Sequence, residues 1–229
     1  MNTDPNAGSD RTSGSDPQVG SLEVLEQELR SLSHGQQALE RIQAFSASLK
    51  KTAARQLVFN PPGSLIREPI GYHEAINVGR IPETEDEFSL LQGDLVTTEA
   101  AYFLGERITG QPKFIIANSS CDLIAGRRQY AALLRVKPLL QDDPGIREQL
   151  NILLRFASSK AMYLPPLPGD SEGVVGHAID FDGIAQVRLN DLLLAKRHAS
   201  LSLIGWRIFG SILRSIMVRA GESEVSLRS

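Results

Sequence analysis

The sequence is poor in cysteine and histidine, and each scarcity excludes a class of protein. The 229 residues contain one cysteine, Cys121, which excludes an internal disulfide framework and favours a reducing compartment. Four scattered histidines and one cysteine lack the paired spacing of a zinc site, so we expect no metal. No glycine-rich loop joins a strand to a helix in a phosphate-binding pattern, and we expect no cofactor.

The sequence also lacks a strong net charge and a long uninterrupted apolar run. Its formal net charge is −3, which provides no overall field toward nucleic acid or an anionic membrane. The most apolar stretch, 201–218, carries Arg207 and Arg214 on one side of a helical projection, which is typical of an amphipathic helix and not of a membrane span. The N-terminus lacks a signal-peptide pattern, so we expect a cytoplasmic protein that does not contact the membrane.

Composition and periodicity divide the chain into three parts. Residues 1–20 are almost devoid of apolar side chains and are predicted to be a disordered tail. Residues 21–60 form a predicted helical segment with a break at Gly35, and its apolar stripe is more typical of a helix packing on its own core than of a coiled coil. We expect a protein partner, or self-association, through the helices of 21–56. Residues 61–229 are predicted to be the core domain.

Short apolar runs in the core domain predict strands separated by turns. They lie at 93–97, 113–117, 130–136 and 161–164, and residues 173–187 are predicted to form two strands that turn at Asp182-Gly183. Helical patterns are inserted between them without regular alternation. The predicted class is therefore α+β, with a small curved antiparallel sheet or an SH3-like barrel, added helices and the N-terminal helical segment.

One segment is chemically distinctive, because an apolar strand at 114–117 runs directly into a polar turn. The polar residues of this turn are Asn118, Ser119, Ser120, Cys121 and Asp122. Polar groups at the end of a rigid strand are held in fixed positions, which suits a binding site. The same residues also suit a structural turn, in which Asp122 pairs with Arg127 or Arg128.

A catalytic role for this turn requires a base. Cys121 is the candidate nucleophile, Asp122 the adjacent carboxylate and His177 the best placed base, with Asp180 or Asp182 to orient the ring. Two short basic groups, Arg127-Arg128 and 196–198, are typical of solvated surface. If they share a face, they would form a modest nucleic-acid patch.

The order of these features resembles a known family. Gly93-Asp94-Leu95-Val96, followed by the strand 114–117 and its polar turn, resembles the start of the SH3-like barrels of the MazF and PemK toxin superfamily. It is also similar to a bacterial group with a Ser-x-Cys-Asp-Leu signature (here 119–123), a Leu164-Pro165 step and an Ala-Ser-Leu-Ser helix (here 199–202).

The resemblance spans about residues 93–219 and implies an SH3-like fold and a family that cleaves RNA. No arginine follows Asp94 at the matching position, so ribonuclease activity is assigned to no residue. Because no catalytic set is complete, the sequence favours a non-catalytic binding or interaction module on an SH3-like barrel. The alternatives are a toxin-like endoribonuclease or nucleic-acid-binding protein, and a Cys121-dependent hydrolase.

Overall fold

The structure is a computed structural model that describes residues 17–83, 87–110 and 112–217, with side chains from residue 22 onward. The helices are α1 (Pro17–Arg30), α2 (Gln36–Ser48), α3 (Thr52–Phe59), α4 (Tyr72–Asn77), α5 (Ile146–Leu153), α6 (Leu189–Leu192) and α7 (Leu203–Met217). The strands are β1 (Ile66–Arg67), β2 (Asp94–Thr97), β3 (Tyr102–Phe103), β4 (Glu106–Arg107), β5 (Lys113–Ile116), β6 (Tyr130–Leu140), β7 (Ala161–Leu164), β8 (Val174–Arg188) and β9 (Lys196–Leu201).

The strands pair antiparallel in one sheet with the order β1-β9-β2-β5-β6-β8-β3-β4, and β7 adds to the first half of β8. The α+β class and the antiparallel sheet are confirmed. The sheet has nine strands, so it is larger than the small sheet predicted. It also does not close into a barrel, because no pairing joins β1 to β4 among the described residues.

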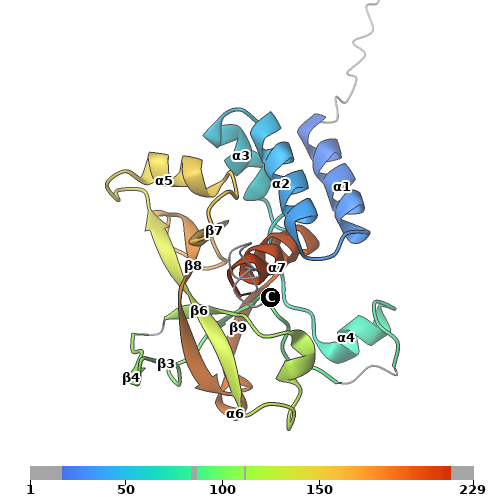
Figure 1. Ribbon diagram of the computed structural model, residues 1–229, viewed down its shortest axis with the longest axis vertical. Helices are drawn as coiled ribbons and strands as arrows, with labels where there is room; N and C mark the ends of the chain where they lie inside the picture. Colours follow the sequence, from blue (N-terminus) through green and yellow to red (C-terminus); the bar gives the residue numbers. More distant parts are fainter. Residues whose placement is uncertain (1–16, 84–86, 111, 218–229) are drawn as a thin grey trace, which may run out of the picture.

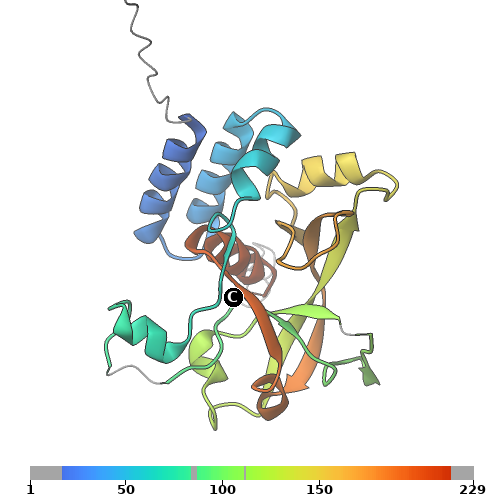
Figure 2. The same cartoon turned by 180° about the vertical axis from the view of Figure 1, so that it is seen from behind.

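Both faces of the central strands are buried. Alternation along β5 sends Ile115 into one apolar cluster and Phe114 and Ile116 into another. The larger cluster lies under α1, α2, α3, α5 and α7, which gather over one end of the sheet (Figures 1 and 2). The smaller cluster is covered by α6 and the turn after β5.

The N-terminal helices belong to this same core. The break predicted at Gly35 is present, since α1 ends at Arg30 and α2 begins at Gln36, and a third helix follows. Leu29 and Ile42 are fully buried in the larger cluster beside residues of α7. The apolar stripe therefore packs on the protein's own core, so self-association through 21–56 would have to use its outer face and stays a prediction.

The starting residues of two helices, α1 and α7, differ from those predicted. Helix α1 starts at Pro17, inside the range predicted to be a disordered tail, and residues 1–16 lie outside the described residues. The segment 199–202 was predicted to start a helix, but its first three residues complete β9, Ser202 follows the strand, and α7 begins at Leu203. No described helix is long and apolar enough to cross a bilayer.

The hairpin predicted at Asp182-Gly183 is wrong. Strand β8 continues through this dipeptide, and the pairing register with β6 shifts there, from Arg135 opposite Asp180 to Leu134 opposite Ile184. The extra residues form a bulge in a single long strand. Glycine suits position 183, because its φ of 153° is rarely adopted by residues with a side chain, and a Cβ atom would lie 3.1 Å from the Phe103 ring on β3.

Candidate functional site

The polar turn after β5 is built mainly by contacts to its own neighbours. Asn118 Oδ1 accepts a hydrogen bond from the backbone N–H of Ala132 at 2.5 Å, and this contact ties the turn to β6. Ser120 Oγ accepts one from the backbone N–H of Gln92 at 3.0 Å. A short 3-10 helix, Ser120–Leu123, then buries Leu123 in the smaller cluster. Asn118 and Ser120 therefore hold the backbone in place.

The remaining members of the turn face solvent. Cys121 is an exposed free cysteine whose Sγ lies 3.2 Å from Ser119 Oγ. Asp122 pairs with Arg128 at 3.1 Å, one of the two pairings that the sequence suggested. Arg127 donates a hydrogen bond to the carbonyl oxygen of Cys121 at 3.1 Å. Both arginines thus stabilise the turn from outside.

The structure does not bring Cys121 and His177 together. His177 on β8 lies opposite Pro138 on β6, whereas the polar turn is anchored to Ala132 of β6. Six residues along β6 separate these points, a distance of about 20 Å, and the two groups lie on opposite sides of that strand. Nor does Asp180 or Asp182 orient the ring, because its two nitrogens lie beside Asp170 Oδ2 and the Pro165 carbonyl oxygen, while Asp180 binds Lys137 at 2.5 Å.

His177 belongs instead to a buried polar cluster with Asp170 and Lys113. Its Nε2 lies 3.5 Å from Asp170 Oδ2, and Lys113 Nζ lies 2.6 Å from Asp170 Oδ1. Burial lowers the pKa of His177, although the Asp170 charge opposes this shift. Asp170 has a lowered pKa despite its burial, because it accepts hydrogen bonds from Lys113 and from the backbone N–H of Leu167. The cluster links β5, β8 and the loop after β7.

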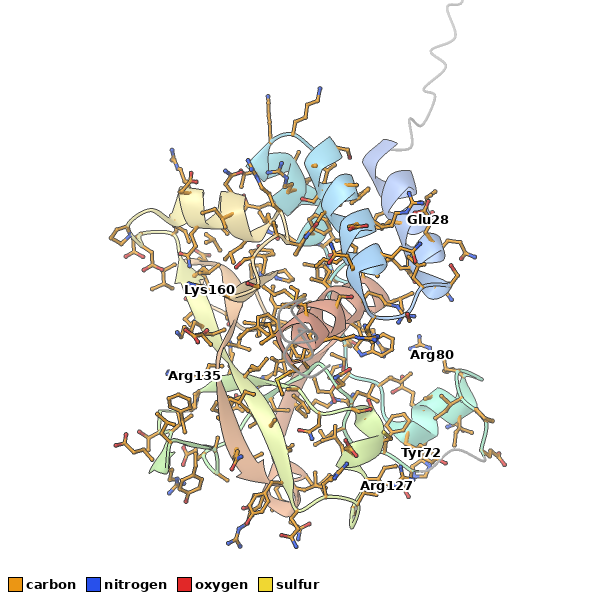
Figure 3. All side chains as sticks on the ribbon, viewed as in Figure 1. Glu28, Tyr72, Arg80, Arg127, Arg135 and Lys160 are labelled. Carbon is orange, nitrogen blue, oxygen red and sulfur yellow. The ribbon has the colours of Figure 1, made fainter. Side chains whose placement is uncertain are left out.

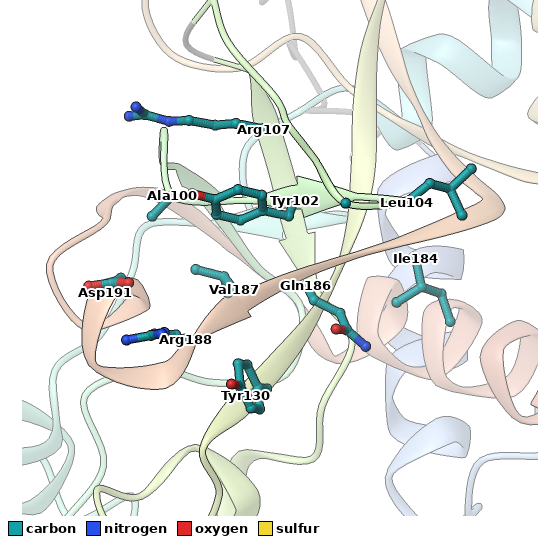
Figure 4. Close-up of a pocket in the computed structure, with 11 residues that line it drawn as sticks. Ala100, Tyr102, Leu104, Arg107, Tyr130, Ile184, Gln186, Val187, Arg188 and Asp191 are labelled. Atoms are coloured by element: carbon teal, nitrogen blue, oxygen red, sulfur yellow. The ribbon is translucent and has the colours of Figure 1, made fainter.

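A second candidate site, at the Arg188 end of β8, was not predicted from the sequence. There the exposed residues Ile184, Gln186 and Arg188 alternate with the buried Ala185 and Val187, so the former three point outward. Tyr102 on β3 lies opposite Gln186 on one side of β8. Tyr130 on β6 lies opposite Arg188 on the other. Figure 4 shows the two tyrosine rings on either side of the β8 segment.

These side chains line a cavity of about 770 Å³ that is continued toward Arg128 by a second of about 580 Å³. We call this surface the tyrosine face. It is formed by Tyr102, Leu104, Tyr130, Ile184, Gln186 and Arg188. Large apolar side chains are abundant on it, with Tyr102 exposed to 48%, Tyr130 to 54% and Leu104 to 89%.

Leu104 has a backbone conformation that is unfavourable for leucine. It forms, with Gly105, the two-residue turn between β3 and β4. Both residues have positive φ, 52° for Leu104 and 87° for Gly105, as a type I′ turn requires. Such a turn favours Asn-Gly, and a leucine there is strained by about 1–2 kcal/mol. The turn therefore presents an apolar side chain to solvent at a cost in conformational energy.

Most charges on the tyrosine face are compensated. Arg107 lies 3.6 Å from Glu99 and also donates a hydrogen bond to the Glu99 carbonyl oxygen at 2.6 Å. Arg128 pairs with Asp122. Arg188 has no ion-pair partner among the residues that the structure describes. A single uncompensated arginine between two tyrosines is a weak attraction for a polyanion and a common arrangement in protein interfaces.

A signal for part of this face was present in the sequence. Leu104-Gly105 stands between Tyr102-Phe103 and Glu106-Arg107, which fits a two-residue hairpin. The pairing of this hairpin with β8 brings together Tyr102 and Gln186, which are 84 positions apart in the chain. No local sequence pattern predicts such a pairing. The described residues contain no group of three histidine, cysteine or acidic side chains that could hold a metal ion.

Comparisons of the chain with protein-family models, with curated proteins and with solved structures find no match. The resemblance to the MazF and PemK superfamily therefore stays a prediction.

Proposed function

We propose that this protein is a non-catalytic binding module that docks a partner protein on the tyrosine face. The observation that carries the proposal is Leu104, an exposed leucine held at positive φ beside two exposed tyrosines. Strained backbone and exposed apolar groups are both unfavourable for the isolated molecule, and both are typical of contact surfaces.

The chemistry of the face favours a protein over nucleic acid. Tyrosine and arginine, together with tryptophan, are enriched among the residues that dominate protein binding energies. Binding to a phosphate backbone needs several free cations, whereas Arg107 and Arg128 already pair with Glu99 and Asp122. The edge strand β4 adds exposed backbone groups next to the tyrosines, which a partner's extended segment could pair with.

The test begins with a photo-crosslinking residue at Ile184, introduced into the full chain in the cells that produce it. The same residue at Ile152, which is equally apolar and exposed at the opposite end of the sheet, is the matched control. Mass spectrometry identifies the protein joined at Ile184 and not at Ile152. Calorimetry with that purified protein then measures how Tyr130→Ala and Arg188→Ala change its affinity.

We expect each variant to weaken binding by about tenfold or more, as interface hot spots do. Arg155→Ala, an exposed arginine that follows α5, leaves the affinity unchanged. Equal cross-linking from Ile184 and Ile152 would overturn the proposal. So would tight, salt-sensitive binding of a short single-stranded RNA that Arg188→Ala abolishes, since that result assigns the face to nucleic acid.

A further inference from the structure

A second cleft lies away from the tyrosine face and shares no lining residue with it. It has a volume of about 590 Å³ and opens between the end of α1, the segment after α4 and the β1 edge of the sheet. Three arginines line it: Arg30 at the end of α1, Arg67 on β1 and Arg80 after α4. Figure 3 shows Arg80 in the gap between α1 and α4.

Two of these arginines are not neutralised. Arg30 pairs with Glu26 at 3.0 Å, but Arg67 and Arg80 have no ion-pair partner among the described residues. Arg67 is half-buried, and its pKa is lowered by burial and then by the charge of Arg80. Asp94 and Glu74 act in the opposite direction, but Asp94 is already bound by Arg197 and Ser200. Arg67 and Arg80 therefore line one cleft without an ion-pair partner among the described residues, and Glu26, the carboxylate in its lining, is already paired with Arg30.

The opposite wall of the cleft is rigid and partly apolar. Gln92 is fixed by three hydrogen bonds: its backbone N–H donates to Ser120 Oγ, its Nε2 donates to the Ala117 carbonyl oxygen, and its Oε1 accepts from Trp206 Nε1. Ser120 Oγ is an acceptor in this network, which leaves its hydrogen to donate to a ligand. The Trp206 ring, braced by His34 at 4.1 Å, and Leu91 complete the wall.

We infer that this cleft binds a small phosphate monoester, with the phosphate between Arg67 and Arg80 and the organic part against Trp206. A phosphate monoester carries a charge of about −1.5 to −2 at neutral pH, which matches two free guanidinium groups. Arginine binds phosphate oxygens in pairs through its planar fork. The volume is that of a small-molecule site and exceeds what a bare phosphate ion fills.

The single tryptophan of the chain gives a direct readout, because Trp206 lines the cleft. Its fluorescence is followed at low ionic strength while the full chain is titrated with adenosine monophosphate, ribose 5-phosphate or inorganic phosphate. We expect saturable changes, with adenosine monophosphate binding more tightly than inorganic phosphate. Arg80→Gln, at an exposed position, is expected to weaken binding by about tenfold or more, since hydrogen bonds to charged groups are worth about 1.5–3 kcal/mol.

Arg41→Gln, an exposed arginine on α2 away from the cleft, is the matched control and leaves the affinity unchanged. Arg67→Lys provides a second variant that keeps the charge and the fold but removes the paired donors, and it also weakens binding. The inference is overturned if none of the three compounds gives a saturable signal, if only inorganic phosphate does, or if Arg80→Gln and Arg41→Gln lower the affinity equally.

Discussion

Asp94 and Arg197 form a buried ion pair that joins β2 to β9. Arg197 Nε lies 2.7 Å from Asp94 Oδ2, and Arg197 Nη2 donates a hydrogen bond to Asp94 Oδ1 at 3.2 Å. Asp94 is fully buried, and it also accepts hydrogen bonds from Ser200 Oγ at 2.6 Å and from the backbone N–H of Leu91 at 2.8 Å. Burial raises the pKa of Asp94, and the Arg197 guanidinium opposes that shift.

Removing one member of this pair leaves the other buried without its counter-charge. Asp94→Asn is therefore expected to lower the free energy of unfolding by about 3–5 kcal/mol in urea denaturation. Glu99→Gln breaks an exposed pair with Arg107 and is the matched control, with an expected change within about 0.5 kcal/mol.

A double-mutant cycle separates the pair from its surroundings. If the pair acts as a unit, Asp94→Asn combined with Arg197→Met costs less than the sum of the single changes, because neither buried charge remains. Strict additivity would contradict a direct interaction between Asp94 and Arg197.

Leu104→Asn is expected to have opposite effects on the stability of the β3–β4 turn and on binding of the partner protein. Asparagine adopts positive φ more readily than leucine, so the β3–β4 turn is expected to be stabilised by about 0.5–1 kcal/mol. Its backbone amides then exchange hydrogen more slowly. The same variant removes an apolar contact and is expected to weaken binding of the partner protein by about tenfold. A variant with faster exchange in the hairpin would contradict the strain assigned to Leu104.

The local elements were predictable from local patterns. The β-branched and aromatic run at β5, the short strand β7 and the amphipathic α7 all arise from the order of neighbouring side chains, and all are present. The sequence also located a polar turn at the end of β5. The contacts that hold this turn in place come from Gln92 and Ala132, and the sequence of the turn does not predict these partners.

The features that the sequence did not predict depend on contacts between segments far apart in the chain. Asp182-Gly183 carries the local chemistry of a hairpin, but pairing with β6 on one side and the Phe103 ring on the other keeps β8 continuous. Arg197 belongs to a short basic group typical of solvated surface, yet Asp94, 103 residues earlier, holds it in the interior. The tyrosine face likewise assembles from three separate stretches of chain.

Acidification is expected to destabilise the fold through His177. Burial lowers the pKa of His177 below its ordinary value of 6.5, so the folded protein keeps the ring neutral where the unfolded chain protonates it. The unfolded state therefore binds more protons, and the free energy of unfolding falls as the pH drops from about 7.5 to about 5.5. Denaturant unfolding across this range measures the slope.

His177→Gln is expected to make that slope shallower without abolishing it, since the pKa values of His34 and His198 are also lowered by burial. His73→Gln is the matched control, because the His73 ring is exposed, and its slope stays that of the unmodified protein. An unchanged slope in His177→Gln would show that the ring binds protons equally in the folded and unfolded states, which would contradict the lowered pKa.

Gly205 on α7 allows the helix to approach the backbone of Leu65, the residue before β1. In a helix, glycine is usually less favourable than alanine by about 1 kcal/mol, so Gly205→Ala would stabilise an unconstrained helix. Here a Cβ atom would lie 2.2 Å from the backbone carbonyl oxygen of Leu65, which no side-chain rotation relieves. We therefore expect the opposite sign, a loss of about 1–3 kcal/mol in the free energy of unfolding. Gly173→Ala, where no atom lies within 4 Å, is the control and changes stability little. A Gly205→Ala protein as stable as the original would mean that α7 does not pack this closely on Leu65.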